Sequence, residues 1–308
     1  MAARQTGEKQ LLPFLKWAGG KRWLWQRRPD LFAVGMNRYV EPFLGGGAVF
    51  FAMQPKRALL SDLNADLVAT YHALRSDWRS VWAKLQIHQR NHLNKKDYYY
   101  IVRESQPRSG SGKAAKFIYL NRTCFNGLYR VNLQGEFNVP RGTKDAVVLS
   151  DDDFAEVARR LRDTNIVAAD FEEIIDTLQE GDFLFADPPY TVKHNLNGFL
   201  KYNERIFSWA DQERLAGAIC RFACRGGKAL VTNAAHSSVI ELYRQIGDIH
   251  ITRRRSVLAS ENARRVEVEE MAVTVGYQIT EQDATAEHAG PGVVPGRENL
   301  TSRHGEGA

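Results

Sequence analysis

Two stretches decide the fold: RYVEPFLGGGAVFFAM at residues 38–53 and KRALLSDLNADLVATYHAL at residues 56–74. Each predicts a strand, a short turn and a helix, and such alternation is typical of parallel strands joined by crossover helices. The pattern returns after Asp151, where NIVAAD, DFLFADPPY and KALVTN are strand-like and helical segments separate them. A last strand pair follows in IHITRRRSVLA and VEEMAVTVGY. The sequence therefore predicts an α/β protein with a Rossmann-like sheet.

A polar, basic segment interrupts this pattern. It begins with helical spacing, continues through SQPRSGSGK at residues 105–113, which predicts a loop, and ends in two short alternating runs around Gln134. Such runs on either side of a Gln-Gly pair indicate a hairpin. After about residue 279 the chain is polar with scattered Gly and Pro, a composition typical of disorder. We therefore expect a discontinuous catalytic domain (1–70 and 150–279), an inserted module (71–149) and a disordered tail (280–308).

Composition narrows the possible classes of protein. The 308 residues carry a formal net charge of +6, which favours a polyanionic partner without proving one. No apolar stretch reaches the length of a membrane span, and the first ten residues lack the apolar core of a signal peptide. The three cysteines form no Cys-x-x-Cys pair, and they offer too few ligands for a metal site. We expect a cytoplasmic protein without a bound metal.

Asp187-Pro188-Pro189-Tyr190 directly follows the apolar strand FLFA. Open α/β sheets bind ligands beyond the carboxyl ends of their strands. These residue types suit methylation of a planar amine, because such a poor nucleophile needs acceptors for both of its N–H groups, here the Asp187 carboxylate and the Pro188 carbonyl. Tyr190 can stack on a base that has swung out of a duplex. A rigid turn would explain the two prolines alone, but the flanking Asp and Tyr favour catalysis.

The glycines at positions 45–47 lie between a strand and a helix, where they let a cofactor approach the backbone closely. A dinucleotide fingerprint would need a third glycine where Phe50 stands, which weakens that interpretation. Asp62 lies fifteen residues beyond Gly47 and follows a strand, a position that commonly binds a ribose diol. Asp62 and Asn64 are also suited to capping the next helix.

PFLKWAGGK at residues 13–21 suits a sulfonium cofactor. An aromatic ring such as Trp17 stabilises a nearby cation by about 0.5–2 kcal/mol. Lys21 can hold a carboxylate of the cofactor or form a hydrogen bond near Asp187. A core tryptophan and a solvated lysine explain the segment equally well when it is taken alone.

The chain resembles the Dam-like (alpha-group) N6-adenine DNA methyltransferases from about Phe14 to Gly276. The resemblance rests on FLKWAGGK, VEPFLGGG, SDLNADL, YLNRTCFNGLYRVN with GEFNVPRG, and DPPY, in that order. It implies S-adenosylmethionine as methyl donor, a catalytic loop at Asp187–Tyr190, and a target-recognition domain in the inserted module. It also implies that Asp170 and Phe171 contact the adenine of the cofactor. The predicted cofactor-binding residues are Trp17, Lys21, Phe43, Gly45, Gly47, Asp62, Asp170, Phe171 and Asp187.

The inserted module suits DNA, because a two-stranded ribbon fits the major groove. Arg130 can form a bidentate contact with guanine, and Asn126 can pair with adenine. Phe125 and Leu128 can fill the space left by a flipped base. The predicted DNA-binding residues are Phe125, Asn126, Leu128, Arg130 and Pro140. Further cations are phosphate contacts in this interpretation, although solvent exposure alone explains each lysine: Lys95, Lys96, Arg103 and Arg122. At most part of Arg253–Arg255 faces DNA, because alternate residues of a strand point to opposite faces.

The combined prediction is a site-specific, double-stranded DNA adenine methyltransferase that acts as a monomer by direct transfer to N6 of a flipped adenine. The hairpin resembles that of relatives that methylate GATC, so we expect GATC or a related short site. Thr143 stands where those relatives often carry a longer basic residue, so one outer base pair can be recognised differently. The sequence leaves open whether a restriction endonuclease acts on the same site.

Three alternatives were weighed against this prediction. An NAD-linked oxidoreductase predicts a complete glycine fingerprint and gives DPPY no role. Methylation of another planar amine, such as cytosine N4, RNA adenine or a glutamine side chain, fits Asp187 and the hairpin less well. A catalytically inactive DNA-binding module predicts a broken DPPY or glycine motif, and both motifs are intact.

Overall fold

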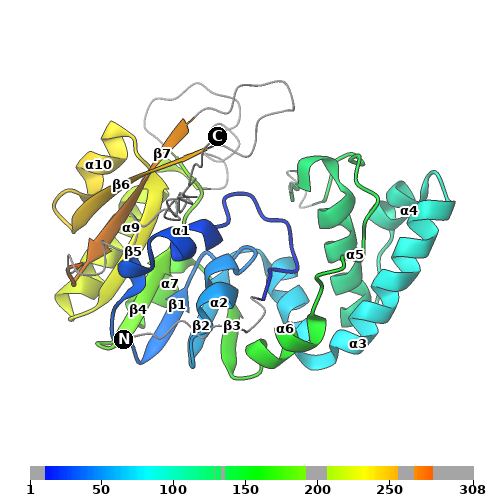
Figure 1. The fold of residues 1–308 in the computed structure, drawn as a ribbon, viewed down its shortest axis with the longest axis horizontal. Coiled ribbons are helices and arrows are strands. Elements are labelled where there is room, and N and C mark those ends of the chain that lie inside the picture. The colour runs from blue at the N-terminus through cyan, green and yellow to red at the C-terminus, as the bar shows by residue number, and fades with distance from the viewer. Residues whose placement is uncertain (1–10, 128, 133–135, 192–206, 256–266, 280–308) are drawn as a thin grey trace, which may run out of the picture.

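The computed structural model describes residues 11–127, 129–132, 136–191, 207–255 and 267–279 (Figure 1). The predicted tail at residues 280–308 lies outside the described residues, as do Leu128 and the turn of the predicted hairpin at residues 133–135.

A seven-stranded sheet with the order β3-β2-β1-β4-β5-β7-β6 forms the centre of the molecule. β1 to β5 pair in parallel, and β7 runs antiparallel to both β5 and β6. This mixed sheet confirms the predicted Rossmann-like α/β class and the final strand pair. The strands are β1 (Arg38–Glu41), β2 (Ala58–Asp62), β3 (Thr164–Ala168), β4 (Asp182–Ala186), β5 (Lys228–Ala234), β6 (Asp248–Arg255) and β7 (Glu267–Val275).

Helices cover both faces of the sheet (Figure 1). The helices are α1 (Arg22–Arg27), α2 (Ala48–Met53), α3 (Ala65–Asn94), α4 (Tyr98–Glu104), α5 (Gly110–Thr123), α6 (Phe154–Leu161), α7 (Phe171–Asp176), α9 (Trp209–Cys224) and α10 (Ser237–Tyr243), with short 3-10 turns η1 (Pro29–Phe32) and η2 (Phe125–Gly127). Every residue of β4 is buried, as expected for a strand with layers on both sides. Its Phe183 and Phe185 pack in the core with α2 and α3, while Leu184 packs in the core with α7 and α9.

α3, α4 and α5 stand together at one end of the molecule, to the right of the sheet in Figure 1. The predicted domain boundary between residues 70 and 71 falls inside α3, and the break in that helix lies at Asp77, which has non-helical backbone angles. The prediction of a loop through residue 113 is wrong, because α5 begins at Gly110. The Ser109 side chain caps the helix by accepting a hydrogen bond from the Gly112 N–H.

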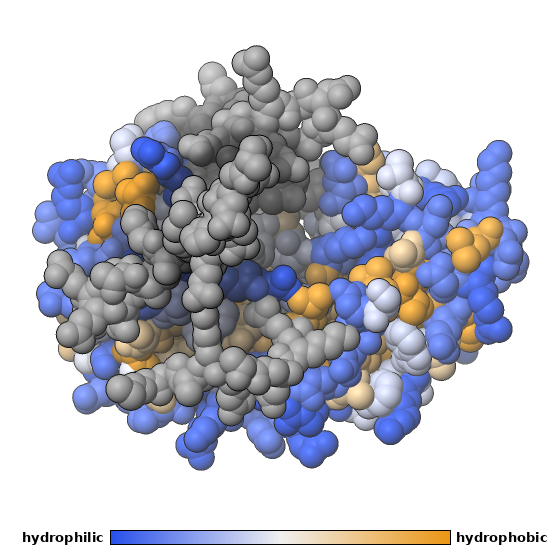
Figure 2. Space-filling model, in the orientation of Figure 1, coloured by the Kyte–Doolittle hydropathy of each residue, from blue (hydrophilic) through white to orange (hydrophobic). Residues whose placement is uncertain are grey.

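The segment after α5 pairs with itself as the predicted hairpin requires. Val131 and Phe137 form an isolated antiparallel bridge, and the Asn132 N–H donates to the Glu136 carbonyl at 2.8 Å. Over the described surface of the face shown in Figure 2, hydrophilic side chains predominate and hydrophobic ones form separate groups. No helix among the described residues combines the length and the apolar composition of a membrane span.

Candidate active site

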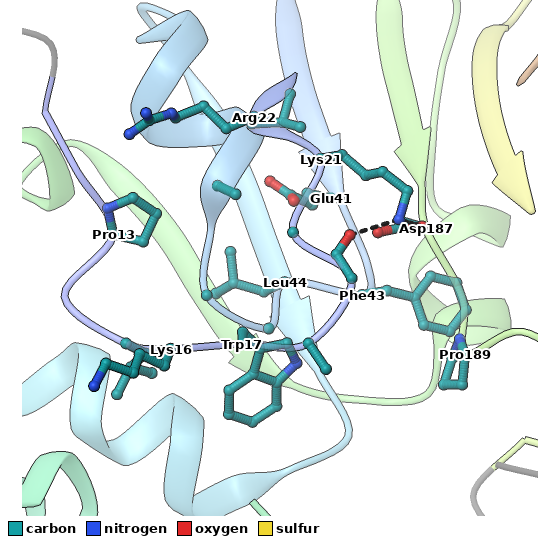
Figure 3. A pocket seen from close by; sticks show the side chains of 18 of the residues that line it. Pro13, Lys16, Trp17, Lys21, Arg22, Glu41, Phe43, Leu44, Asp187 and Pro189 are labelled. Atoms are coloured by element: carbon teal, nitrogen blue, oxygen red, sulfur yellow. Dashed lines mark hydrogen bonds and ion pairs between the residues drawn. The ribbon is translucent and has the colours of Figure 1, made fainter. Parts of the chain in front are cut away.

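A pocket of about 520 Å³ lies at the carboxyl ends of β1 and β4. Segments far apart in the sequence line it: the loop before α1, the turn between β1 and α2, and the chain that follows β4 (Figure 3). Gly127 and Tyr129, which follow α5, complete the wall. The carboxyl edge of a parallel sheet is the usual ligand site of this architecture.

The turn between β1 and α2 brings a tryptophan against the backbone. Gly45 has a φ of +48°, and a Cβ at this position would lie 2.6 Å from the Trp17 ring. Only glycine accommodates both the left-handed backbone and the close ring. The turn is tied down from outside the pocket, since the Asp62 carboxylate accepts from the Gly45 N–H at 2.9 Å and the Tyr71 hydroxyl donates to the Gly45 carbonyl at 3.0 Å.

The Asp187 carboxylate faces a lysine in this pocket. Lys21 Nζ lies 3.0 Å from Asp187 Oδ1, as Figure 3 shows, and it also donates to the Gly19 carbonyl at 2.5 Å. The Thr232 hydroxyl, from β5, donates to the same Oδ1 at 2.7 Å. Burial raises the pKa of Asp187, and the charge of Lys21 and the bond from Thr232 oppose this rise. These two donors therefore favour the charged form of the carboxylate, which burial disfavours.

Tyr190 is fixed by a second acidic side chain. Its hydroxyl donates to Glu270 Oε2 at 2.8 Å, and Lys21 Nζ lies 4.9 Å from the centre of its ring. The same Oε2 lies 3.7 Å from Lys21 Nζ. Lys21 is therefore shared between two carboxylates, Asp187 and Glu270, and only 2% of it is exposed.

A third carboxylate lines the pocket at the end of β1. Glu41 is 3% exposed and accepts a hydrogen bond from the Tyr39 hydroxyl at 2.9 Å. Burial raises the pKa of Glu41 well above its usual range; the bond from Tyr39 opposes this rise, and the negative charge of Asp187 adds to it. Among the described residues, no group of three or more His, Cys, Asp or Glu side chains is placed to hold a metal ion.

Comparison with known proteins decides which chemistry this site belongs to. The family model of the D12 class N6 adenine-specific DNA methyltransferases matches residues 17–257. The chain belongs to this family. Family membership makes DNA the substrate and adenine the methylated base, and it implies S-adenosylmethionine as the methyl donor.

Similar proteins carry names that agree. The chain is 32% identical over 279 residues to the type II methyltransferase M1.LlaDCHI of Lactococcus lactis subsp. cremoris, covering 88% of this chain and 97% of the relative. It is 33% identical over 245 residues to the type II methyltransferase M.MjaIII of Methanocaldococcus jannaschii, covering 73% and 85%. It is also 32% identical over 212 residues to a DNA adenine methylase of Serratia marcescens, covering 66% and 76%.

Most of the catalytic and cofactor-binding residues predicted for this D12-class methyltransferase meet at the pocket. The four residues of the DPPY segment line it, together with four of the predicted cofactor-binding residues: Trp17, Lys21, Phe43 and Gly45. Four others stand behind the wall or beside it. Gly47 caps α2 with a φ of +64°, and Asp62 holds Gly45. Asp170 caps α7 and pairs with Arg214 at 2.8 Å, while Phe171 stacks on Phe43 with ring centres 5.3 Å apart.

Two of the predicted DNA-binding residues of this methyltransferase, Phe125 and Asn126, form η2, and Arg130 and Pro140 follow it in the chain. Phe125 is 52% exposed, Asn126 is exposed with a φ of +55°, and Arg130 is exposed with its Nε donating to Asn138 at 3.2 Å. The exposed Pro140 accepts a hydrogen bond from the Phe125 N–H through its carbonyl, which pins the loop to the hairpin. Leu128 lies outside the described residues. Lys95 and Lys96 are exposed, and Arg103 pairs with Glu104 at 3.0 Å.

The prediction that Arg122 contacts a phosphate is wrong, because the side chain is only 1% exposed and cannot reach one. Its guanidinium forms two bonds of 2.6 Å to Asp152 and donates to the carbonyls of Phe14 and Val147. The neighbouring Asn121 binds the backbone N–H and carbonyl of Lys16 at 2.8 and 2.7 Å. α5 therefore holds the loop that forms one wall of the pocket.

Sequence reasoning missed three polar residues of the site: Glu41, Thr232 and Glu270. Each stands in or at the end of a strand whose other residues are largely apolar. A polar residue in a buried strand is the signal that would have marked them, since such a group needs a partner inside the protein.

Proposed function

We propose that the chain methylates N6 of an adenine flipped out of duplex DNA, within GATC or a closely related short site. The single observation that carries this proposal is the Asp187 carboxylate, held by Lys21 and Thr232 in the wall of a pocket of about 520 Å³. The resemblance of the hairpin to that of GATC-methylating relatives supports the target site.

The pocket fits S-adenosylmethionine in size and in chemistry. Its volume of about 520 Å³ lies within the usual range for small-molecule sites, roughly 300–1,000 Å³. Trp17 offers a ring to a sulfonium cation and Glu41 an acid to an ammonium group, while Lys21 lines the site and pairs with Asp187. Phe43 and Gly45 would hold the rest of the cofactor. The residues behind or beside the wall would shape or extend the site: Gly47, Asp62, Asp170 and Phe171. When bound, the cofactor supplies a methyl group on a good leaving group, so the proposed transfer needs no metal ion.

In this proposal the segment after β4 binds and orients the target base. The Asp187 carboxylate accepts one N–H of the adenine amine, and the Pro188 carbonyl accepts the other, which directs the nitrogen lone pair at the methyl group. Pro188 and Pro189 stiffen the segment, because proline fixes φ. Tyr190 stacks on the flipped base. The charged carboxylate is the stronger acceptor, so the ion pair of Asp187 with Lys21 is part of the proposed mechanism.

Residues 71–149 provide the proposed target-recognition domain. Arg130 contacts a guanine with its planar fork, and Asn126 pairs with adenine. Phe125, which is exposed, fills the space of the flipped base together with Leu128 on this proposal, and the Pro140 carbonyl holds the Phe125 N–H. Lys95 and Lys96 meet phosphates on this account.

The biological setting follows from the same proposal. The chain acts as a monomer in the cytoplasm on double-stranded DNA. Its relatives carry both type II methyltransferase and DNA adenine methylase names, so a restriction endonuclease acting on the same site stays a prediction.

Mapping of modified bases tests the proposal. The protein is incubated with unmethylated genomic DNA and S-adenosylmethionine, and single-molecule sequencing then locates the modified bases. The expected result is N6-methyladenine in GATC or in a site that differs from it at one outer base pair. Modification of cytosine, or of adenines in an unrelated motif, would contradict the proposed target.

A further inference from the structure

Glu270 is an unusual residue for the interior of a sheet. It lies on β7, paired in register with Ala234 of β5 and Thr252 of β6, and only 2% of it is exposed. A buried carboxylate is unfavourable unless it is paired and hydrogen-bonded. Two of its contacts are groups of the active site: the Tyr190 hydroxyl at 2.8 Å and Lys21 Nζ at 3.7 Å.

These contacts reach both ends of the DPPY segment. Glu270 binds Tyr190, the last residue of the segment, directly. It reaches Asp187, the first residue, through the shared Lys21, which lies 3.0 Å from Asp187. β7 is paired with a strand on both sides, so Glu270 has a fixed position in the sheet. From there it can hold the loop that follows β4.

We propose that Glu270 is a positioning residue for methyl transfer, which fixes the Tyr190 ring and divides Lys21 between two carboxylates. This inference rests on the proposed function, in which the segment Asp187–Tyr190 holds the target adenine.

The charge balance explains why a second carboxylate serves the reaction. Lys21 interacts with Glu270 as well as with Asp187, so Asp187 does not take its full charge and retains more of the power to accept an adenine N–H. Without Glu270, Lys21 would pair with Asp187 alone, and the carboxylate would be a weaker acceptor. The bond to Tyr190 has a separate effect, because it fixes the plane of the ring on which the base stacks.

The charge of Glu270 also bears on the titration of Asp187. Among the described residues, the charged and polar groups that act on Asp187 include Lys21, Thr232 and Glu270 and, at longer range, Glu41 and Tyr39. The negative charge of Glu270 raises the pKa of Asp187, acting against Lys21. Loss of that charge therefore lowers the pKa of Asp187 and moves the acidic limb of the pH–rate profile toward lower pH.

Two conservative substitutions separate the two contacts. Glu270→Gln keeps the shape and an acceptor for Tyr190 but removes the charge, while Tyr190→Phe keeps the ring but removes the donor. Glu269→Gln is the matched control: it removes a carboxylate from the adjacent position of β7, where Glu269 is 48% exposed and pairs with Arg253. The readouts are kcat and KM on duplex DNA, the pH profile of kcat, and the calorimetric Kd for S-adenosylmethionine.

We expect Glu270→Gln to lower kcat about tenfold, which corresponds to about 1.4 kcal/mol. The acidic limb of its pH–rate profile should lie at lower pH than that of the wild type. Tyr190→Phe lowers kcat by a similar factor without moving that limb, and neither variant changes the cofactor Kd more than about twofold. Glu269→Gln behaves like the wild type.

Two different failures are distinguishable in this experiment. If the wild type methylates adenine and Asp187→Ala abolishes that activity, yet Glu270→Gln and Tyr190→Phe match Glu269→Gln in rate and pH profile, the positioning role is wrong and the proposed function stands. If the wild type transfers no methyl group to adenine, the proposed function itself fails.

Discussion

The close approach of Trp17 to the glycine turn predicts the effect of one added methyl group. Gly45→Ala places a Cβ 2.6 Å from the Trp17 ring, whereas carbon atoms pack at about 3.5–4.0 Å, so the ring or the turn must shift by about 1 Å. The left-handed backbone, with a φ of +48°, adds about 1–2 kcal/mol of strain for any residue with a Cβ. Both effects fall on the proposed cofactor wall.

We expect Gly45→Ala to lower the free energy of unfolding by about 1–2 kcal/mol and to weaken S-adenosylmethionine binding at least tenfold. Thermal denaturation gives the first quantity and calorimetry the second. Gly35→Ala is the control, since nothing lies within 4 Å of its added Cβ and its φ is not in the left-handed region. A Gly45→Ala protein with wild-type stability and cofactor affinity would refute the assignment of this turn to the cofactor pocket.

Three further substitutions test other parts of the account. Lys21→Met removes the cation that opposes the raised pKa of Asp187, so the pKa rises further and the acidic limb of the pH–rate profile moves to higher pH; an unmoved limb would remove Lys21 from this role. Arg122→Ala leaves Asp152 as a buried unpaired charge, so it should reduce the free energy of unfolding, measured by urea denaturation, by about 3–5 kcal/mol. A reduction well under 1 kcal/mol, as for substitution of a surface arginine, would contradict this role. Arg130→Ala should lose about 1–3 kcal/mol of discrimination at one base pair while adenine methylation continues; unchanged preference across a randomised site library would exclude Arg130 from base recognition.

The sequence predicted the strands and turns that position the site. The apolar runs before Glu41, Asp62 and Asp187 could only be buried, and their place in a strand–turn–helix order put their ends at one edge of the sheet. One of the two roles predicted for Lys21 was a hydrogen bond near Asp187, and Lys21 does contact the Asp187 carboxylate.

Two sequence-based predictions went wrong because tertiary contacts decide them. Gly110 and Gly112 disfavour a helix, yet α5 begins there, because Ser109 caps it and α5 packs extensively against α3. Arg122 has a charge that suits phosphate, but its partner Asp152 lies thirty residues away in the chain, where no local pattern indicates a contact. The position of Glu270 in a buried strand marks it as a residue that needs a partner, but the sequence does not identify that partner, since Tyr190 lies eighty residues before it.

The role of Asp187 is the central claim, and single-turnover methyl transfer measures it most directly. The wild type and Asp187→Ala are each saturated with labelled S-adenosylmethionine and mixed with a duplex that contains one unmethylated GATC site, after calorimetry has shown that both proteins bind the cofactor. We predict labelled N6-methyladenine from the wild type and a loss of at least a thousandfold, about 4 kcal/mol, in the transfer rate of Asp187→Ala. Transfer by Asp187→Ala at a rate near that of the wild type would contradict the account.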